Sequence, residues 1–324
     1  MQEQIFNIQN EDDFKTCALK VFKHQFENNA VYRSFCDLLY IHPSDVKELK
    51  EIPFLPIQFF KSHKILSSKE SVLEIFTSSG TTGSVTSKHL VTDISWYEKS
   101  YLKGFEYFYG NIEDYTILAL LPNYLEREGS SLIYMVDDLI KKSKKSASGF
   151  YLNDIGKLSN KLTHLNKNNR KTLLIGVTYA LLDLIEQQEF QLNNTIIMET
   201  GGMKGRRKEL IRDQLHEILC EGFGVTEIHS EYGMTELLSQ GYSKGNGIFD
   251  CPPWMKILTR DTEDALTILE NSKTGGLNVI DLANYNSCSF IATQDLGKVN
   301  PNGNFEVLGR FDHSDIRGCN LMVM

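Results

Sequence analysis

The order of apolar and polar positions predicts an amphipathic helix near the start of the chain. Between residues 11 and 29 the apolar side chains recur at helical spacing, and Asn10 precedes them as an N-cap. Residues 52–61, Ile-Pro-Phe-Leu-Pro-Ile-Gln-Phe-Phe-Lys, do not have this helical pattern. Their prolines exclude a regular helix and their apolar side chains are costly to expose, so we expect an extended segment packed against the body.

Further along, short apolar runs alternate with helical patterns. The runs predict strands at 115–121, 171–177 and 195–199, and the helical patterns cover 130–141, 179–188, 205–220 and a segment that begins near Asp93. Strands that alternate with helices indicate parallel βαβ units. The predicted fold class is therefore α/β, with parallel sheets flanked by helices.

The pattern changes beyond residue 240. Short alternating or apolar segments such as 266–269 and 277–280 are separated there by glycine- and proline-containing turns, which is typical of antiparallel β structure. We expect an α/β core over residues 1–240, a β-rich subdomain over 241–310 that completes a site, and a tail over 311–324.

Composition and charge narrow the function. The 324 residues are 41% hydrophobic and 23% charged, which is ordinary for a globular protein, and the net charge of −8 disfavours nucleic acid or an anionic membrane as the main partner. The start of the chain has no basic and apolar leader, and no run approaches the length of a membrane span, so we expect a cytoplasmic protein. The six cysteines form no C-x-x-C pair, which indicates neither a disulfide framework nor a zinc site.

A loop rich in hydroxyl groups, within residues 76–90, is suited to phosphate. Gly80 and Gly83 would let backbone N–H groups approach an anion, and Lys88 would add positive charge. Further hydroxyl donors are Ser78, Ser79, Thr81 and Thr82. The Walker A pattern G-x-x-x-x-G-K-[ST] is absent, which excludes a P-loop kinase or GTPase. The alternative is an ordinary polar surface loop.

Four other polar stretches follow apolar runs. They are Glu199-Thr-Gly-Gly-Met203, Glu231-Tyr-Gly-Met-Thr-Glu236, Thr293-Gln-Asp-Leu-Gly297 and Gly309-Arg-Phe-Asp-His-Ser-Asp-Ile-Arg-Gly318. Each is a weak signal alone, but their order behind the hydroxyl-rich loop resembles the adenylate-forming superfamily of acyl- and aryl-CoA ligases. Within it, the chain most resembles the acyl-protein synthetases of bacterial bioluminescence, the fatty-acid-activating component of the fatty acid reductase complex. That likeness includes Ile52-Pro-Phe-Leu-Pro-Ile57, Leu121-Pro-Asn-Tyr-Leu-Glu-Arg127 and Arg317-Gly-Cys319.

The resemblance implies a role for each matching residue. Residues 78–83 would hold the β- and γ-phosphates of ATP, and Gly201 and Gly202 would lie flat against adenine. In the stretch Tyr232-Gly233-Met234-Thr235-Glu236, the tyrosine would stack on adenine, the threonine would hydrogen-bond the α-phosphate and Glu236 would hold Mg²⁺. A carboxylate ligand suits this hard cation. Asp295 would accept hydrogen bonds from the ribose hydroxyls, and Arg310 would lie near ribose and phosphate.

The implied reaction is attack of a carboxylic, most simply fatty, acid on ATP, which gives acyl-AMP and pyrophosphate. The acyl group would then pass to a thiol of an acyl carrier protein, CoA or Cys319, and a reductase subunit is a possible partner. The family's loop continues Gly-x-Pro-Lys, whereas here Ser-Val-Thr-Ser separates Gly83 from Lys88, and the chain ends 14 residues after Arg310, without a lid domain. For Cys319 the alternative is an incidental thiol in a frayed tail.

Two alternatives concern other side chains and the function itself. His229 could line a nucleotide pocket, whereas His89 and His313 are interpreted as ordinary packed or solvent-facing histidines. No G-x-S-x-G elbow occurs, which disfavours a serine hydrolase. The second functional hypothesis is a lid-less, non-catalytic homologue that binds nucleotide or acyl-adenylate as a partner subunit.

Overall fold

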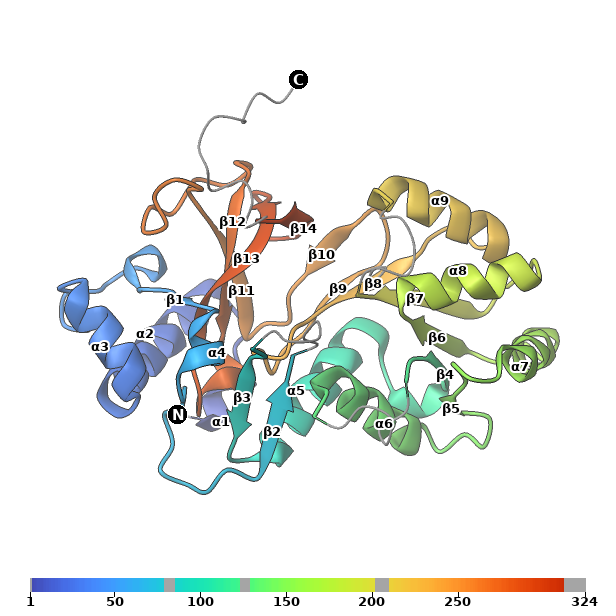
Figure 1. The fold of residues 1–324 in the computed structure, drawn as a ribbon, viewed down its shortest axis with the longest axis horizontal. Coiled ribbons are helices and arrows are strands. Elements are labelled where there is room, and N and C mark those ends of the chain that lie inside the picture. Colours follow the sequence, from blue (N-terminus) through green and yellow to red (C-terminus); the bar gives the residue numbers. More distant parts are fainter. Residues whose placement is uncertain (1, 79–84, 123–128, 202–209, 312–324) are drawn as a thin grey trace. The chain divides into compact units, whose positions relative to one another are not determined.

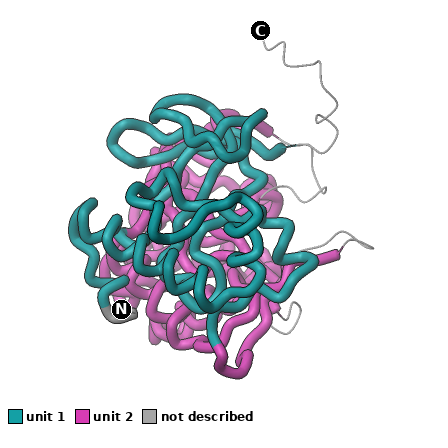
Figure 2. Tube along the Cα trace, turned by 90° about the vertical axis from the view of Figure 1, so that its left-hand side faces the viewer, with its two compact units in different colours: residues 1–68, 253–324 teal, residues 69–252 magenta. Residues whose placement is uncertain are grey.

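The computed structural model describes residues 2–78, 85–122, 129–201 and 210–311. The chain forms two compact units, one from residues 1–68 and 253–324 and one from residues 69–252 (Figure 2). We call them the split unit and the continuous unit. This division differs from the predicted ranges, because the N-terminal helices join the C-terminal strands.

The continuous unit is built on one sheet with the strand order β10-β9-β8-β7-β6-β4-β5. Its strands are β4 (Thr116–Leu120), β5 (Gly149–Phe150), β6 (Thr172–Gly176), β7 (Thr195–Thr200), β8 (His229–Tyr232), β9 (Gly241–Ser243) and β10 (Ile248–Asp250). The strands from β5 to β8 pair in parallel, and β9 and β10 are antiparallel additions. Every residue of β4 and β6 is buried, as expected for parallel strands covered on both faces. The predicted α/β fold class is confirmed.

Helices connect these strands (Figure 1). They are α5 (Ile94–Tyr109), α6 (Ser131–Ser143), α7 (Ile155–Lys167), α8 (Thr178–Gln187) and α9 (Arg212–Phe223), with a 3-10 turn at Ile112–Asp114. Helix α6 packs on β4, and α8 packs on α9. At the second contact a Cβ atom on Gly222 would lie 2.6 Å from Cβ of Ile185, so the absence of a side chain lets the helices approach.

The split unit contains an antiparallel sheet of β11 (Met255–Arg260), β12 (Gly275–Asp281), β13 (Phe290–Val299) and β14 (Phe305–Arg310) in that order. Strand β1 (Leu55–Pro56) pairs in parallel with β13, which confirms that part of residues 52–61 is extended against the body. The strand expected at 266–269 is reduced to a single bridge between Ile268 and Arg260.

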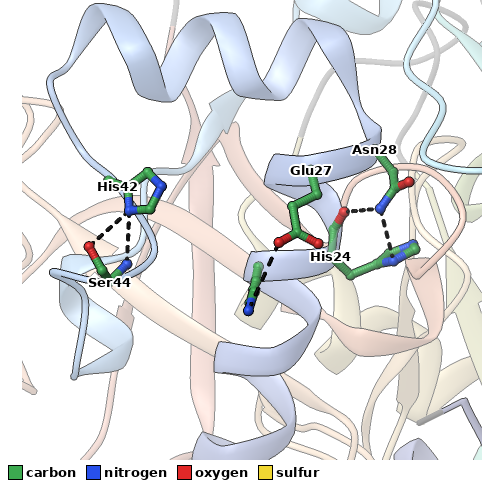
Figure 3. Close-up of polar contacts among 6 residues, drawn as sticks. His24, Glu27, Asn28, His42 and Ser44 are labelled. Atoms are coloured by element: carbon green, nitrogen blue, oxygen red, sulfur yellow. Dashed lines mark hydrogen bonds and ion pairs between the residues drawn. The ribbon is translucent and has the colours of Figure 1, made fainter.

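The helices of the split unit are α1 (Gln2–Ile5), α2 (Glu11–Asn28), α3 (Ala30–Leu38) and α4 (Phe59–Ser62), with 3-10 turns at Leu49–Glu51 and Leu282–Asn284. The predicted N-cap is present, because the Asn10 side chain accepts a hydrogen bond from the Asp13 amide at 2.9 Å. Near the other end of α2, Asn28 donates to the His24 carbonyl, and His42 lies beside Ser44 after α3 (Figure 3). Asn28 is the last residue of α2, so its contact lies at the end of that helix.

The interior of the split unit joins α2 to the C-terminal sheet. The rings of Phe22 and Phe290 meet edge to face at 6.1 Å, and the buried Gln25 amide donates to the carbonyls of Asn284 and Tyr285. The Gln25 carbonyl in turn accepts from the Ser289 amide. In the part of the chain that the structure describes, no helix is both long and apolar enough to cross a membrane.

Candidate functional site

The hydroxyl-rich loop starts from a two-stranded hairpin. Strands β2 (Glu74–Thr77) and β3 (Lys88–Val91) are antiparallel, with Thr77 opposite Lys88. Beyond this pair, the Ser78 amide donates to the Ser87 carbonyl at 3.2 Å, and the Ser87 amide donates to Ser78 Oγ at 2.9 Å. The two ends of the loop therefore meet, and the side chain of Lys88 is exposed. Ser79, Gly80, Thr81, Thr82 and Gly83 lie outside the described residues.

A glycine that the sequence did not single out fixes the end of β2. The Thr77 amide donates to the Gly129 carbonyl at 2.7 Å. Gly129 has a φ of +73°, and a Cβ atom there would lie 3.0 Å from Thr77 Oγ1. A side chain at this position would be strained by both the backbone angle and the contact. Glycine thus allows the chain before α6 to lie against the base of the loop.

Two predicted motifs lie at the carboxyl ends of neighbouring parallel strands. Thr200, the last residue of β7, pairs with Glu231 in β8, so Gly201 and Tyr232 follow side by side. Gly201 has a φ of +70°, and its carbonyl accepts a 2.6 Å hydrogen bond from Thr178 Oγ1. This edge is where α/β sheets bind their ligands. Gly202 lies outside the described residues.

The stretch after β8 turns sharply. A Cβ atom on Gly233 would overlap Oε1 of Glu231, so this position needs glycine for close packing. The Tyr232 ring is buried and meets Phe249 edge to face at 6.0 Å. Thr235 and Glu236 form the next turn, in which the Glu236 side chain is 5% exposed. The Thr235 carbonyl lies 2.8 Å from Nδ1 of the buried His89 in β3. His89 is therefore packed, as one of its two predicted interpretations had it.

A buried carboxyl group underlies this edge. Thr200 Oγ1 donates a 2.6 Å hydrogen bond to Oε2 of Glu231. Burial raises the pKa of Glu231 to about 7, and the negative charge of Glu199 acts in the same direction while the hydrogen bond opposes it. His216 Nε2 lies 3.7 Å from Oε1 of Glu199, beyond hydrogen-bond distance. Burial thus favours the protonated form of Glu231.

His229 belongs to the packing of the continuous unit. Its Nδ1 atom lies 3.1 Å from the Tyr109 hydroxyl, and burial, with the nearby Lys244, lowers its pKa to about 4. The imidazole is therefore neutral at physiological pH. Its place at the start of β8 puts it at the opposite end of that strand from Tyr232.

Asp295 and Arg310 meet in the split unit. They are partners in the register of β13 and β14, and Arg310 Nε donates to Asp295 Oδ1 at 3.0 Å. The Asp295 side chain is 10% exposed and that of Arg310 is 72% exposed. The Asp295 amide donates to Thr293 Oγ1 at 3.1 Å, which fixes the backbone at the carboxylate.

A buried arginine stiffens the same sheet and was not predicted. Arg260 donates to the Leu277 carbonyl, Asn278 Oδ1 and the Thr293 carbonyl. A Cβ atom on Gly276 would lie 2.5 Å from Arg260 Cζ, so glycine leaves room for the guanidinium. The sequence around Arg260 gives no sign of this role, because the hydrogen-bond partners of Arg260 lie on two other strands.

The continuous unit contains Ser78, Lys88, Gly201, Tyr232, Gly233, Thr235 and Glu236, and the split unit contains Asp295 and Arg310. Cys319 lies outside the described residues. Among the residues that are described, no group of three or more His, Cys, Asp or Glu could hold a metal ion. The buried carboxylate of Glu236, which follows Thr235, still fits Mg²⁺ that is carried on substrate phosphates. This ion keeps several of its waters and needs only one or two protein carboxylates.

Comparison with known proteins gives a family and two curated relatives. The family model "Acyl-protein synthetase, LuxE" matches residues 4–113. The long-chain-fatty-acid–luciferin-component ligase of Vibrio harveyi is 23% identical over 342 residues, which cover 98% of this chain and 89% of the relative. The ligase of the same name from Photorhabdus luminescens is 34% identical over 70 residues, 21% of this chain and 60% of the relative.

Two solved structures share the fold. ATP-bound MatB from Rhodopseudomonas palustris aligns with a TM-score of 0.56 and 18% identity over 75% of this chain and 49% of that chain. The chain therefore spans about half the length of MatB. The 2-hydroxyisobutyryl-CoA ligase in the postadenylation state, in complex with R3-HIB-AMP, aligns with a TM-score of 0.66 and 12% identity over 93% of this chain and 68% of that chain.

These comparisons confirm the predicted fold first. The fold is that of the adenylate-forming ligases. The narrower resemblance, to the acyl-protein synthetases, is confirmed by the family model and by a relative that matches almost the whole chain. The prediction of an enzyme of the ligase class is likewise confirmed by both curated relatives.

Proposed function

We propose that this protein activates a carboxylic acid, most simply a fatty acid, with ATP and Mg²⁺ and then transfers the acyl group to a thiol. The observation that carries the proposal is the pairing of Thr200 with Glu231, which brings Gly201 and the Tyr232–Glu236 stretch together at the carboxyl edge of the sheet. Both motifs belong to the pattern that the adenylate-forming ligases share. The name of the Vibrio harveyi relative supports a long-chain fatty acid as the substrate.

In the first step the substrate carboxylate attacks the α-phosphorus of ATP. A phosphorus–oxygen bond forms to the acid, the bond to the bridging oxygen breaks, and pyrophosphate leaves with the released electron pair. Thr235 would donate its hydroxyl to the α-phosphate, and Glu236 would hold Mg²⁺, which supplies charge neutralisation when bound. Residues 78–83 and Lys88 would hold the departing phosphates. These groups position the reactants and stabilise charge, without a proton transfer.

We assign Asp295 to the ribose hydroxyls and Arg310 to ribose and phosphate, as the resemblance implies. Asp295 is a carboxylate whose backbone is fixed by Thr293, and Arg310 lies beside it on the next strand. An acceptor of this kind suits the 2′- and 3′-hydroxyls of a nucleotide. We assign Gly202, together with Gly201, to the face of the adenine ring, and Tyr232 to its stacking partner.

In the second step a thiolate attacks the acyl carbon of the mixed anhydride, and AMP leaves. The proposed acceptors of the acyl group are Cys319, CoA or an acyl carrier protein. A reductase subunit is a further proposed partner, and the proposed location of the protein is the cytoplasm. A cysteine acceptor would leave a thioester on the protein. Acyl label should then appear on the wild-type chain and be lost from Cys319→Ser. Label that remains on the variant at the wild-type level would exclude Cys319 as the acceptor.

The first step is tested by incubating the full chain with α-labelled ATP, Mg²⁺ and fatty acids of graded length and isolating acyl-AMP. We expect a labelled adenylate that depends on both acid and metal. A chain that binds ATP but forms no adenylate with fatty, aryl or amino acids would instead be the non-catalytic binding subunit.

A further inference from the structure

The buried His89 connects the two parts of the continuous unit that are assigned to ATP phosphates and Mg²⁺. Its Nδ1 atom lies 2.8 Å from the carbonyl oxygen of Thr235, 146 residues along the chain. A carbonyl can only accept, so Nδ1 carries the hydrogen and donates it. We propose that His89 is a positioning residue that holds the Thr235–Glu236 turn against the base of the phosphate loop. This inference rests on the proposed function and deepens it.

The hairpin gives His89 a fixed origin. His89 pairs with Phe76 in the β2–β3 register, next to the Thr77–Lys88 pair. The Phe76 ring is fully buried and meets Tyr97 edge to face at 5.3 Å. The histidine itself is 1% exposed. A movement of β3 at His89 would therefore move Lys88 and the base of the loop with it.

The turn at Thr235, by contrast, is not part of any strand. Strand β8 ends at Tyr232 and β9 begins at Gly241, and the segment between them crosses the sheet edge without ladder hydrogen bonds. Its described contacts include the bond from the Leu237 amide to the Met234 carbonyl and the Ser100–Ser239 hydroxyl pair at 3.1 Å. The bond from His89 ties the backbone of Thr235 directly to the hairpin.

This link has a chemical consequence. The phosphate loop and the Thr235–Glu236 turn would contact different atoms of the same MgATP, so their spacing must match the length of the triphosphate. A buried hydrogen bond that is lost leaves an unpaired carbonyl and frees the turn, and a misplacement of about 1 Å near a reacting group can cost on the order of 100-fold in rate. His89 would act on nucleotide binding through Thr235 and Glu236, without touching the carboxylic acid.

The test compares His89→Leu, which removes the donor, with His89→Asn, whose amide can place an N–H near the Nδ1 position. Val91→Ala is the matched control, because Val91 is buried two residues further along β3 and lies on the same face as His89. Equilibrium binding of MgATP without acid, the KM values for MgATP and acid in pyrophosphate exchange, and the melting temperature are measured for each.

We expect His89→Leu to raise the Kd and KM for MgATP about tenfold or more while the KM for the acid stays within twofold. His89→Asn should recover most of the affinity. Val91→Ala should lower the melting temperature yet keep the Kd for MgATP within twofold of the wild type. If His89→Leu does not fold, His89→Gln, whose amide reaches the Nε2 position instead, provides the same contrast with His89→Asn.

Wild-type MgATP affinity in His89→Leu, or equal losses in His89→Leu and Val91→Ala, would overturn the inference. The binding measurement also separates it from the proposed function. A wild-type chain that binds MgATP but gives no acid-dependent exchange contradicts catalysis and leaves the binding comparison to decide the role of His89. A wild-type chain that does not bind MgATP contradicts both.

Discussion

Arg310 donates a hydrogen bond from Nε to Oδ1 of Asp295 at 3.0 Å, from the position directly opposite on the neighbouring strand. Asp295 is nearly buried and Arg310 is largely exposed. Because water screens the charge of the exposed Arg310 side chain, the ion pair contributes little to folding stability. We therefore interpret the pair as one in which Arg310 orients the Asp295 carboxylate for a bound ligand.

Asp295→Ala should weaken nucleotide binding through the ribose. Charge-assisted hydrogen bonds contribute about 1.5–3 kcal/mol each, so we expect the kcat/KM for ATP to fall about 10- to 100-fold. The decisive comparison uses 2′,3′-dideoxy-ATP in both proteins. Removal of the hydroxyls should impair the wild type strongly and the variant hardly at all. Equal penalties in the two proteins would show that Asp295 does not contact the ribose.

Glu236→Gln should change the metal requirement. The amide keeps the size of the side chain but loses the charge that suits Mg²⁺, so half-maximal exchange should need at least tenfold more Mg²⁺. Titration of the exchange rate with Mg²⁺ at fixed ATP measures this shift. Glu217→Gln, at an exposed position of α9, is the control and should follow the wild-type curve. A variant with the wild-type Mg²⁺ dependence would remove Glu236 from the metal site.

The raised pKa of Glu231 predicts how stability depends on pH. In the folded chain this pKa is about 7, compared with an ordinary value of 4.5, so the folded state binds more protons than the unfolded state between these values. The free energy of unfolding should therefore fall as pH rises through this window, by on the order of 2 to 3 kcal/mol for this group.

Glu231→Gln should remove that loss, because the amide stays neutral and its oxygen can still accept from Thr200. Relative to the wild type, the variant should gain stability in denaturant titrations as pH rises from 4.5 to 8. A constant difference between the two proteins at every pH would contradict the raised pKa.

Gly222→Ala should destabilise the contact between α8 and α9. Its Cβ atom would meet the Ile185 side chain at 2.6 Å, and overpacking typically costs about 1–3 kcal/mol. Gly156→Ala in α7 is the matched control, since a Cβ atom there meets nothing within 4 Å, and it should be neutral or stabilising by up to about 1 kcal/mol. Similar melting temperatures for the two glycine variants would contradict the packing.

Local signals made much of the fold predictable. Helix α2 combines helical periodicity with the Asn10 cap, and β4 is an apolar run too short for a helix, so neighbouring residues determine both. The division into units was not predictable in this way. It depends on contacts such as Gln25 with Asn284, which are 259 residues apart and leave no periodic trace.

The candidate site, like the fold, could be predicted only in part from the sequence. The order of the motifs singled out Gly201, Thr235 and Glu236, whereas β8, which pairs with β7, was not among the predicted strands. The link from His89 to Thr235 and the buried Arg260 escaped prediction, because a single polar residue in an apolar strand has the same appearance whether it packs or positions a neighbour. Only the hydrogen bonds in the structure distinguish the two roles.

Acid-dependent exchange of labelled pyrophosphate into ATP, measured on the full chain alone with a panel of fatty, aryl and amino acids, tests the central claim most directly. Exchange requires reversible attack of a carboxylate on the α-phosphorus, whichever thiol later accepts the acyl group. The account predicts Mg²⁺-dependent exchange that is stimulated by at least one apolar carboxylic acid. Folded protein that binds MgATP yet shows no exchange above the acid-free rate with any member of the panel would contradict it.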